Sequence, residues 1–388
     1  MKRDFEAIVL GLGGIGSGAL YWLARELGGE VMGIEQFEHG HSRGASQDHS
    51  RIIRYSYHRP FYVRLARRAY AAWAAVEEET GERLVYRVGG LDLFPEGGAI
   101  PARDYTESLD AGDVPWERLE AAEVRRRWPP FRIPDGVWGL YQADGGLVAA
   151  AKANAAHLAA ARRRGARVVA EEPVTAVRAK GGEVEVVTGR NAWRARRLIL
   201  AAGAWSNAVL AHLGLRLPLT ITREQVTYFA PADLGPFARD RFPVWIWMDE
   251  PCFYGFPVFG EAAVKVAEDV GGAETTADGR SFDPDPEGLE RVRDFCRRIL
   301  PAALGPELLT KTCLYTLTPD RDFVIDAVPG HPGILVAIGA GHAFKFASAI
   351  GQILAELALA GESDTDLEPF RIDRSILLAE NPPKSFFV

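Results

Sequence analysis

A glycine-rich turn near the N-terminus has the residue types and the spacing needed to bind a phosphate group. Gly11, Gly13 and Gly16 form the pattern GxGxxG between a short apolar strand-like run, 7–10, and an alanine- and leucine-rich segment that predicts a helix to about Leu27. Gly11 permits a tight turn, Gly13 lets the backbone approach a pyrophosphate, and Gly16 allows the helix to pack closely on the strand. The helix N-terminus would then face the phosphates.

An acidic residue completes this pattern. A second strand is predicted over 30–34, and Glu35 follows it, 24 residues after Gly11, where a carboxylate can accept hydrogen bonds from a ribose diol. We therefore expect the turn and the acid to bind a dinucleotide. The residues in this prediction are Gly11, Gly13, Gly14, Gly16 and Glu35. The motif by itself fits NAD and FAD equally well.

Cationic side chains follow in the polar, glycine-containing loop 40–60, which holds Arg43, Arg51 and Arg54. The pair Ile52-Ile53 lies between two of these arginines and indicates that the loop is partly buried. A buried guanidinium needs an anionic partner, and a ligand carboxylate or phosphate is such a partner. A solvated basic loop is the alternative interpretation.

Lysine is scarce in this chain, so a lysine in an apolar or glycine-rich context is more informative than usual. The lysines among the 45 basic residues are Lys2, Lys152, Lys180, Lys265, Lys311, Lys345 and Lys384. Lys265 stands in the run Ala-Val-Lys-Val-Ala, where we expect a polar interior rather than a solvent-facing strand. Lys345 follows the glycine-rich loop Gly-Ala-Gly-His-Ala-Phe, at the start of a long apolar helix predicted over 344–359.

The elements that must position these residues fall into two kinds of segment. Segments 1–85, 145–215 and 318–388 show strand–helix alternation and predict a discontinuous α/β nucleotide-binding domain, including a helix over 147–164. Segments 86–144 and 216–317 are assigned to an inserted domain, because alternating aromatic stretches after 217 predict an antiparallel sheet. Within this domain, residues 95–144 have poor periodicity, and a helix is predicted over 281–298.

Composition narrows the function further. The chain has 388 residues, 47% of them hydrophobic and 25% charged, and a net charge of −7, which excludes nucleic acid as the main partner. Cys252, Cys296 and Cys313 are too few for a disulfide framework, and the histidines lack metal-ligand spacing, so no metal is predicted. We see no signal peptide and no apolar run of about 18–20 residues, and therefore expect a cytoplasmic protein without a membrane partner.

Separated motifs, in order along nearly the whole chain, make the prediction more specific. They are GLGGIG (11–16), SRIIR (50–54), FYGFPVFG (253–260) with Lys265 after it, CLYT (313–316), FVID (323–326) and GAGHAFKF (339–346). Together they resemble the monomeric sarcosine oxidase and N-methyltryptophan oxidase family of FAD-dependent amine oxidases, within the D-amino-acid oxidase superfamily. The resemblance implies a Rossmann-like FAD-binding domain with an inserted antiparallel-sheet substrate domain, and a monomer.

The same resemblance implies how the cofactor is held. FAD would be joined covalently through a thioether from Cys313 to the flavin 8α-carbon, and Ser50, Gly341 and Lys345 would also contact it. The positive end of the helix that follows Lys345 would face the flavin pyrimidine ring. Lys265 would lie beside flavin N5 and assist the reaction with oxygen, because a cation stabilises the negative charge that develops there.

Substrate-binding residues are also implied by the resemblance. Arg51 and Lys345 would clamp the substrate carboxylate, the arginine as a planar fork and the lysine as a point charge. His342 and Tyr254 would line the pocket as active-site residues together with Asp269. Three further residues, Asp320, Arg321 and Asp326, are expected to be structural and to cap loops of the flavin domain.

Asp269 departs from the family pattern, which usually has histidine four residues after the lysine. A carboxylate there would favour a cationic amine, or it would pair with Lys265 and shift the pKa values of both groups. Fructosyl-amino-acid oxidases, which are relatives, carry an acid at about this position. The reaction type is unaffected by this difference, but the substrate is left open.

The implied activity is the oxidation of a secondary amino acid, most simply sarcosine, with water and O₂ to give glycine, formaldehyde and hydrogen peroxide. A fructosyl-amino-acid oxidase, or an oxidase of another N-alkyl or cyclic amino acid, is the first alternative. A dehydrogenase that passes electrons to a protein or quinone and a non-catalytic nucleotide-binding protein are the others. Lys265 disfavours the dehydrogenase, and a scaffold would need neither Cys313 nor Arg51.

Overall fold

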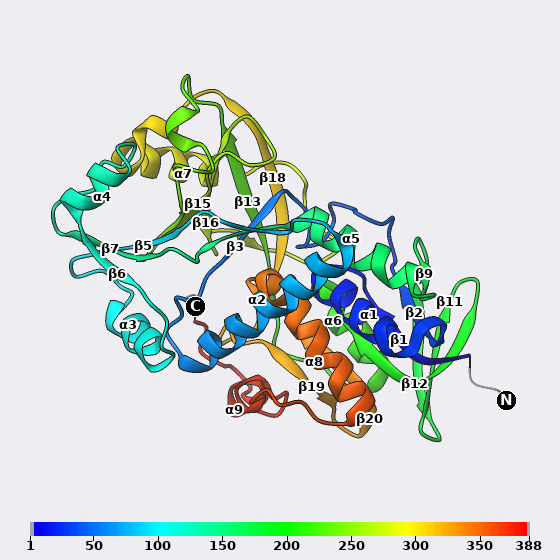
Figure 1. The fold of residues 1–388 in the computed structure, drawn as a ribbon. Coiled ribbons are helices and arrows are strands. Elements are labelled where there is room, and N and C mark those ends of the chain that lie inside the picture. The colour runs from blue at the N-terminus through cyan, green and yellow to red at the C-terminus, as the bar shows by residue number, and fades with distance from the viewer. Residues whose placement is uncertain (1–3, 386–388) are drawn as a thin grey trace.

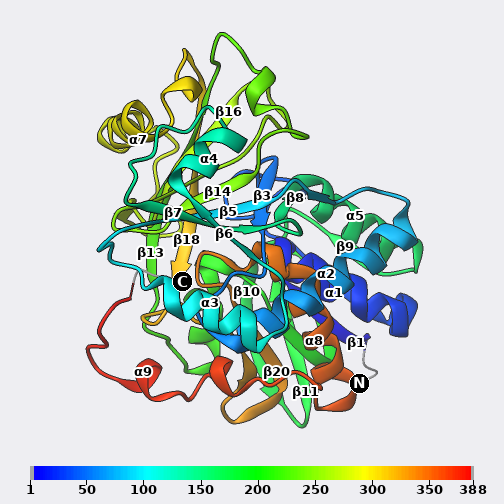
Figure 2. The same cartoon turned by 60° about the vertical axis from the view of Figure 1, so that its left-hand side comes forward.

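The computed structural model describes residues 4–385 and arranges them around two large β-sheets (Figures 1 and 2). In Figure 1, helices α1 (Gly14–Leu27) and α8 (Ala347–Ala360) lie at the lower right with the first sheet. Strand β13 (Thr220–Phe229) and helix α7 (Pro286–Ile299) belong to the second body, at the upper left. The functional residues come from both bodies.

The first sheet carries the predicted nucleotide-binding unit. Its strands are β1 Phe5–Leu10, β2 Val31–Ile34, β9 Arg167–Val169, β10 Val174–Lys180, β11 Glu183–Thr188, β12 Ala192–Leu200, β19 Val324–Val328 and β20 His331–Ile338. They run in the order β10-β11-β12-β1-β2-β9, with β20 pairing with both β12 and β19. β1 is parallel to β2 and to β12, and β12 is parallel to β20, so the carboxyl ends of these strands meet at one edge. Ligands of open α/β sheets bind at such an edge.

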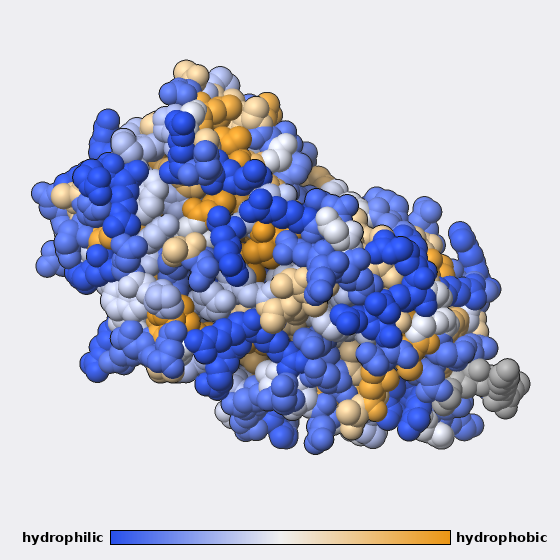
Figure 3. Space-filling view, in the orientation of Figure 1, coloured by the Kyte–Doolittle hydropathy of each residue, from blue (hydrophilic) through white to orange (hydrophobic). Residues whose placement is uncertain are grey.

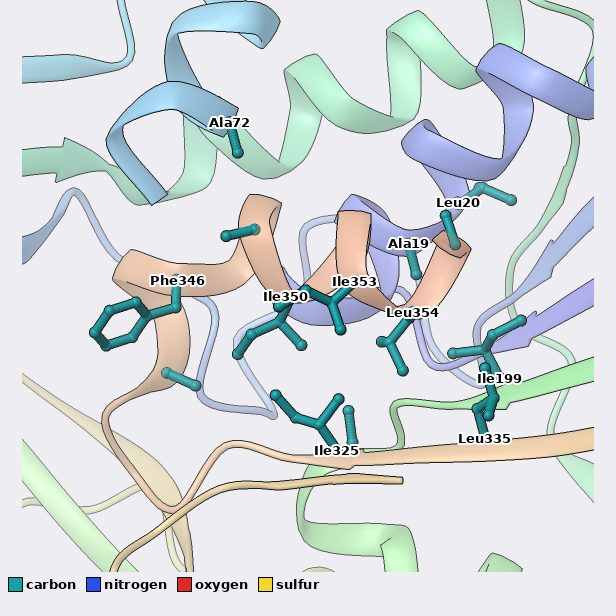
Figure 4. Close-up of a cluster of buried hydrophobic side chains, with 14 of the residues drawn as sticks. Ala19, Leu20, Ala72, Ile199, Ile325, Leu335, Phe346, Ile350, Ile353 and Leu354 are labelled. Atoms are coloured by element: carbon teal, nitrogen blue, oxygen red, sulfur yellow. The ribbon is translucent and has the colours of Figure 1, made fainter. Parts of the chain in front are cut away.

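Helix α8 covers this sheet and fixes the turn that precedes it. Ile350 and Leu354 are fully buried and point toward the sheet, Ile350 on the side of Ile325 and Leu354 on the side of Leu335 and Ile199 (Figure 4). Burying such a side chain stabilises the fold by roughly 1.5–3 kcal/mol. The packing therefore holds the 3₁₀ turn Ala343–Phe346 in place, and this turn carries Lys345.

One segment, Ala343–Ala360, is long and apolar enough to cross a membrane by length and composition, with a mean hydropathy of 1.4 over 18 residues. The expectation that no run reaches this length is therefore wrong for this segment. Its apolarity has another cause, because 61% of the window is buried inside the protein, between the first sheet and the neighbouring helices.

The second sheet is the predicted inserted layer. Its strands are β5 Gly90–Pro95, β6 Glu117–Glu120, β7 Val137–Gln142, β13 Thr220–Phe229, β14 Val244–Trp247, β15 Cys252–Gly255, β16 Val264–Asp269, β17 Ala273–Glu274 and β18 Glu307–Leu317. The order is β17-β13-β16-β15-β14-β5-β7-β6, with β18 on the other side of β13. Neighbouring strands are antiparallel except β14 and β5, which are parallel. The predicted fold class is confirmed, with this one parallel pair as a departure.

Strand register brings candidate residues onto common faces of this sheet. Tyr228 of β13 is directly opposite Lys265 of β16, and Glu224 of β13 is directly opposite Cys313 of β18. Side chains directly opposite each other in an antiparallel pair lie on the same face and close together. Lys265, Cys313 and their two partners are therefore positioned by one strand, β13.

A short three-stranded sheet corrects the predicted helix over 147–164. It consists of β3 (Ser50–Ile53), β8 (Gly146–Ala149) and β4 (Val85–Arg87), with β8 between the other two. Leu147 and Val148 are fully buried in this sheet, and the helix α5 begins only at Ala150 and ends at Arg163. The first residues of the predicted helix instead form strand β8, which pairs with β3 and β4. A short apolar run is compatible with either a helix or a strand, so the sequence alone does not decide between them.

The remaining helices complete the structure. Their bounds are α2 Pro60–Thr80, α3 Ala102–Ala111, α4 Ala121–Arg127, α6 Ser206–Leu210 and α9 Ser375–Leu378. The predicted helix over 281–298 begins later, at Pro286, because the Asp285 side chain accepts hydrogen bonds from the backbone N–H groups of Glu287 and Gly288. Residues 95–144 hold α3, α4, β6 and β7. The division of the chain at 85/86, 144/145, 215/216 and 317/318 stays a prediction.

The outer surface in the orientation of Figure 1 is mostly hydrophilic, with smaller apolar patches (Figure 3). Among the described residues, the large hydrophobic side chains that are exposed are Phe282, Leu308, Leu359 and Leu378. Single exposed apolar residues are ordinary on a globular protein and define no docking surface.

Candidate active site

A cavity of about 670 Å³ is lined by residues of both bodies and contains most of the predicted site residues. Those that line it are Gly11, Gly13, Gly14, Glu35, Arg51, Tyr254, Asp269, Gly341, His342 and Lys345. Gly16, Ser50, Lys265 and Cys313 lie outside this lining. The cavity thus joins the glycine-rich turn at one end to a group of charged and aromatic side chains at the other.

The glycine end is tightly built. Gly11 has φ +83°, in the left-handed region that favours glycine, and a Cβ on Gly16 would lie 1.8 Å from the Gly11 carbonyl oxygen. The Gly14 N–H, at the start of α1, donates a 2.7 Å hydrogen bond to Ser46 Oγ. Gly16 therefore packs beneath the turn, while Gly11, Gly13 and Gly14 face the cavity.

Glu35 lies beside this turn at the end of β2 and is buried. Its Oε2 accepts a 2.8 Å hydrogen bond from the Leu12 N–H, and its Oε1 accepts a 3.2 Å bond from the Phe37 N–H. Burial alone would raise the pKa of Glu35, but hydrogen bonds from His41 and from the Leu12 N–H outweigh it and lower the pKa. A carboxylate held ionised at this edge can accept further hydrogen bonds from a ribose.

Lys265 is enclosed beneath the cavity. Its Nζ lies 2.6 Å from Asp48 Oδ2 and donates a 2.9 Å hydrogen bond to the Ser50 carbonyl, and the Lys265 and Asp48 side chains are each 3% exposed. The same Nζ is 4.4 Å from the centre of the Phe256 ring. Burial lowers the pKa of Lys265 to about 8, although the Asp48 carboxylate opposes that effect. The predicted polar interior is what the structure contains, with Asp48 as its acid.

The two arginines of the β3 region have different surroundings. Arg51 donates 2.8 Å hydrogen bonds to the Ser50, Ala45 and Gln47 carbonyls, so much of its guanidinium holds the preceding loop. Arg54 donates a 2.9 Å bond to Asp92 Oδ1, and this pair is buried. Its Nε is also buried and has no hydrogen-bond partner within residues 4–385.

Lys345 lines the cavity without an acidic partner. No hydrogen bond or ion pair joins its Nζ to another of the described residues, and its ring neighbours Tyr57 and Phe346 are 5.8 and 5.9 Å away. Burial and the nearby Arg54 guanidinium lower the pKa of Lys345 to about 7, although Asp269 opposes the shift. Arg51, the arginine predicted as the partner of Lys345, lowers that pKa as well.

Asp269 forms an ion pair with Arg321 rather than with Lys265. Both terminal nitrogens of Arg321 lie 3.4 Å from Asp269 Oδ2, and Arg321 is 1% exposed. The alternative pairing of Asp269 with Lys265 is wrong, because four residues along a strand span about 13 Å. Arg321 also lines the cavity, and its expected structural role stays a prediction. Asp320 binds the Arg374 guanidinium, and Asp326, in β19, accepts from the backbone N–H groups of Ala327 and Ile372.

His342 and Tyr254 line the cavity near these charges. The His342 Nε2 donates a 2.8 Å hydrogen bond to the Arg321 carbonyl, and burial, with Lys345 nearby, lowers the pKa of His342 well below its usual value. The ring is therefore neutral, with Nδ1 as an acceptor that has no partner in the described part of the chain. Burial raises the pKa of the Tyr254 hydroxyl and that of the Cys313 thiol, the latter to about 11.

Comparison with known proteins decides the family. Residues 6–357 match the family of FAD-dependent oxidoreductases that includes D-amino-acid oxidase. The chain belongs to this family of FAD-dependent oxidoreductases. It is 36% identical to monomeric sarcosine oxidase of Streptomyces avermitilis over 369 residues, which are 93% of this chain and 95% of that protein. It is 31% identical to N-methyl-L-tryptophan oxidase of Salmonella arizonae, over 95% of this chain and 99% of that one.

Solved structures share the fold of this oxidoreductase. NikD, an amino acid oxidase essential for nikkomycin biosynthesis, superposes with a TM-score of 0.84 at 24% identity, covering 95% of this chain and 98% of that chain. L-Proline dehydrogenase from P. horikoshii gives a TM-score of 0.82 at 22% identity, covering 96% and 99%. The predicted resemblance to the sarcosine oxidase family and the predicted flavoenzyme class are confirmed.

The residues present fit the FAD that the family binds. A side chain on Gly11 would meet the Ala201 carbonyl oxygen at 2.5 Å, and one on Gly14 would meet the Phe344 ring at 2.9 Å, so this edge admits only bare backbone. Such a surface, next to an ionised Glu35 and the start of α1, suits a pyrophosphate and a ribose. No group of three or more metal-ligating side chains occurs in residues 4–385.

Sequence reasoning missed several residues of the oxidoreductase site. The sequence singles out neither Asp48 nor Asp92, gives Arg54 only the general expectation of an anionic partner, and predicts a structural role for Arg321. The signal for Asp92 was present, because an acid between Leu91 and Leu93 in a buried strand requires a cationic partner. The pairing of Asp48 with Lys265 had no such local signal, because the two residues are 217 positions apart.

Proposed function

We propose that this oxidoreductase is an oxidase of N-alkyl amino acids, with sarcosine as the simplest substrate. The overall reaction is sarcosine, water and O₂ to glycine, formaldehyde and hydrogen peroxide. The observation that carries the proposal is Lys345, a cavity cation without an anion, beside the partly unsatisfied guanidinium of Arg54. The identity to sarcosine oxidases over nearly the whole chain supports the same reaction.

In this proposal the substrate carboxylate completes the site. It accepts a hydrogen bond from Lys345 Nζ, and the Arg54 guanidinium, which lines the same cavity, adds positive charge beside it. Charge-assisted hydrogen bonds of this kind are about twice as strong as neutral ones. Arg51 was predicted as the partner of Lys345, and it remains a cavity residue that fixes the loop over 45–50.

In this proposal the alkyl part of the substrate faces apolar walls, and the electrons removed from it pass to the cofactor. Ile246, Met248 and Tyr254 line the cavity and exclude water from the reacting carbon. When FAD is bound, it takes two electrons from the C–H bond next to the amine and passes them to O₂. We place Lys265 beneath that region as the cation of the oxygen reaction, and His342 as a neutral wall of the pocket.

Covalent attachment of FAD through Cys313 is part of the proposal. Cys313 is 8% exposed in β18, and Arg51 and Lys265 are the nearby cations that favour its thiolate. A thiolate is the nucleophile that a thioether requires. Replacing Cys313 with alanine should give a flavin that acid precipitation releases, whereas a flavin still attached would place the link elsewhere.

A fructosyl-amino-acid oxidase is the second candidate, and one observation favours it. The Asp269–Arg321 pair puts both signs of charge on the cavity wall, where the usual family members have a histidine. A sugar substituent carries hydroxyl groups that can donate to Asp269 and accept from Arg321. Fructosamine oxidase from Aspergillus fumigatus has the same fold, with a TM-score of 0.81 at 19% identity.

One experiment separates the two candidates. The purified yellow protein is mixed anaerobically with sarcosine or with fructosyl-glycine, flavin bleaching is followed, and air is then admitted. Bleaching by sarcosine, followed by recovery and stoichiometric peroxide, supports the first proposal. Bleaching by fructosyl-glycine alone supports the second. A yellow protein that neither compound bleaches would contradict both.

A further inference from the structure

We propose that Asp48 is the counter-ion of Lys265, a positioning residue that aims the lysine and keeps its ammonium group charged. The inference rests on the proposed function, because it concerns the lysine assigned there to the oxygen reaction. Asp48 lines the cavity, but in this proposal it contacts neither the substrate nor the reacting atoms. Its effect passes through Lys265.

The geometry of the pair supports this role. Asp48 Oδ2 lies 2.6 Å from Lys265 Nζ, and the second strong contact of that nitrogen is the Ser50 carbonyl at 2.9 Å. The same nitrogen makes a weaker contact, at 3.4 Å, with Ser50 Oγ. Lys265 Nζ therefore donates to Ser50 and forms an ion pair with the Asp48 carboxylate, and a neutral amine would leave that carboxylate without this positive charge.

Asp48 is in turn fixed by groups that keep it ionised. Its Oδ1 accepts a 2.8 Å hydrogen bond from the Tyr228 hydroxyl and a 3.2 Å bond from Lys311 Nζ, and Arg51 lies 3.8 Å from Oδ2. Burial would raise the pKa of Asp48, but Lys265 and Arg51 hold it well below its usual range. The carboxylate is thus a permanent negative charge shared by Lys265, Lys311 and Arg51.

The backbone at Asp48 has an unusual conformation that its side-chain contacts help to hold. Asp48 has φ +81°, in the left-handed region where glycine is favoured and an aspartate is strained. Strain of this kind, of order 1–3 kcal/mol, persists only where the surrounding contacts over-determine it. The contacts that do so are the four on its carboxylate.

Lys265 depends on Asp48 because the other groups around it do not replace that charge. The titratable and charged groups that face the pair from the packed elements are Asp48, Arg51, Tyr228, Lys311 and Cys313, with the His49–Glu261 pair beyond Tyr228. Burial and Arg51 both lower the pKa of Lys265, and Asp48 is the largest influence that raises it. Without Asp48, the lysine would lose its proton at a lower pH.

The first test measures Lys265 directly and needs no turnover. The FAD-loaded protein is labelled with ¹³C-lysine, and its seven lysine signals are titrated by NMR, with Lys265→Met identifying the relevant one. The wild-type midpoint is expected near 8. In Asp48→Asn the midpoint should fall by one pH unit or more, whereas an unchanged or higher midpoint would overturn the proposal.

A second substitution guards against misfolding. Asp48→Gly removes the same carboxylate but relieves the left-handed backbone, so it should be less destabilised than a variant that keeps a side chain there. Its Lys265 midpoint should fall as in Asp48→Asn. Lys311→Met is the matched control, because it removes a partner of Asp48 but leaves the Asp48–Lys265 pair, and the Lys265 midpoint should not fall.

The second test follows the oxygen reaction of flavin reduced with dithionite, so that it is independent of the amine substrate. In Asp48→Asn the rate should drop about fivefold at pH 8 for a one-unit shift, yet come within roughly a tenth of the wild-type rate at pH 6. A structural defect would lower the rate at both pH values and would contradict the proposal. A shifted Lys265 midpoint with an unchanged oxygen rate would support the counter-ion and contradict the oxygen role assigned to Lys265.

Discussion

Two buried lysines of this protein are held in opposite ways. Lys265, on β16, is enclosed by Asp48, Ser50 and aromatic rings, and its charge is balanced inside the protein. Lys345, in the turn before α8, faces the cavity, and within residues 4–385 it has no acidic partner. We interpret a cation that is balanced by an acid of the protein as part of the fixed site. We interpret a cavity cation without such an acid as the place where a ligand supplies the anion.

The cavity arginines follow the same rule. Arg54 is paired with Asp92, and Arg321 with Asp269, each through buried or half-buried contacts. A buried charge without a partner is costly, so folding has neutralised most of these cations. Lys345 escapes part of that cost because burial lowers its pKa to about 7, and it can lose its proton until an anion arrives.

The largest effect should come from removing the enclosed lysine. Lys265→Met should slow the reaction of reduced flavin with O₂ by about 10²–10³-fold, the usual loss when one preorganised electrostatic group is deleted. Reduction by substrate should change little, because Lys265 lies outside the cavity lining. Stopped-flow measurement of the two half-reactions tests this. Equal slowing of both half-reactions would contradict the assignment of Lys265 to the oxygen reaction and of Lys345 to substrate binding.

Removing the cavity lysine should have the converse effect. Lys345→Met should lower kcat/KM for the amino-acid substrate by about 10–150-fold, since a hydrogen bond to a charged group contributes roughly 1.5–3 kcal/mol. The oxygen reaction of chemically reduced flavin should be retained. Lys311→Met is a matched control, because Lys311 contacts Asp48 but is not among the residues that line the cavity. An unchanged KM and kcat in Lys345→Met would remove Lys345 from the carboxylate site.

The pH dependence of anion binding sharpens the contrast. A carboxylate ligand raises the pKa of Lys345 above its free value of about 7. Binding is therefore strongest below pH 7 and weakens by up to tenfold per pH unit as the pH rises through that value. Propionate, which has no amine to titrate, is the suitable ligand, and flavin absorbance reports its binding. Lys345→Met should bind weakly at every pH, with the slope gone.

The parts of this fold that sequence predicts are those set by neighbouring residues. The strand, glycine turn, helix and acid around Gly11 and Glu35 are local, and their geometry follows from glycine conformation and strand order. The start of α5 was misplaced, because Leu147 and Val148 are apolar in either a helix or a strand. Pairing with β3 and β4, which are distant in sequence, decides the outcome.

The charge pairs of the site could not be predicted for the same reason. Asp48, in the loop before β3, contacts Lys265 of β16, and Asp92 of β5 contacts Arg54, which follows β3. Neither relation leaves a periodic or spacing signal in the chain. The residue types predict that the buried cations need anionic partners. Only the tertiary structure shows which of these cations has an acidic partner within the protein.

The smallest effect is expected from Asp92→Asn, which removes the acid that balances the charge of Arg54 and leaves that charge to a ligand. Asp92→Asn keeps the shape of the side chain and one of the two oxygens that accept from Arg54 and Ser56, but it removes the negative charge of a residue only 3% exposed. The Arg54 charge would then face the cavity unbalanced, like Lys345. Propionate should bind a few-fold more tightly, and without ligand the protein should unfold at a lower temperature, a loss that propionate partly restores by binding the native state. Weaker propionate binding in a folded Asp92→Asn protein would show that Asp92 orients Arg54 for the ligand instead of competing with it.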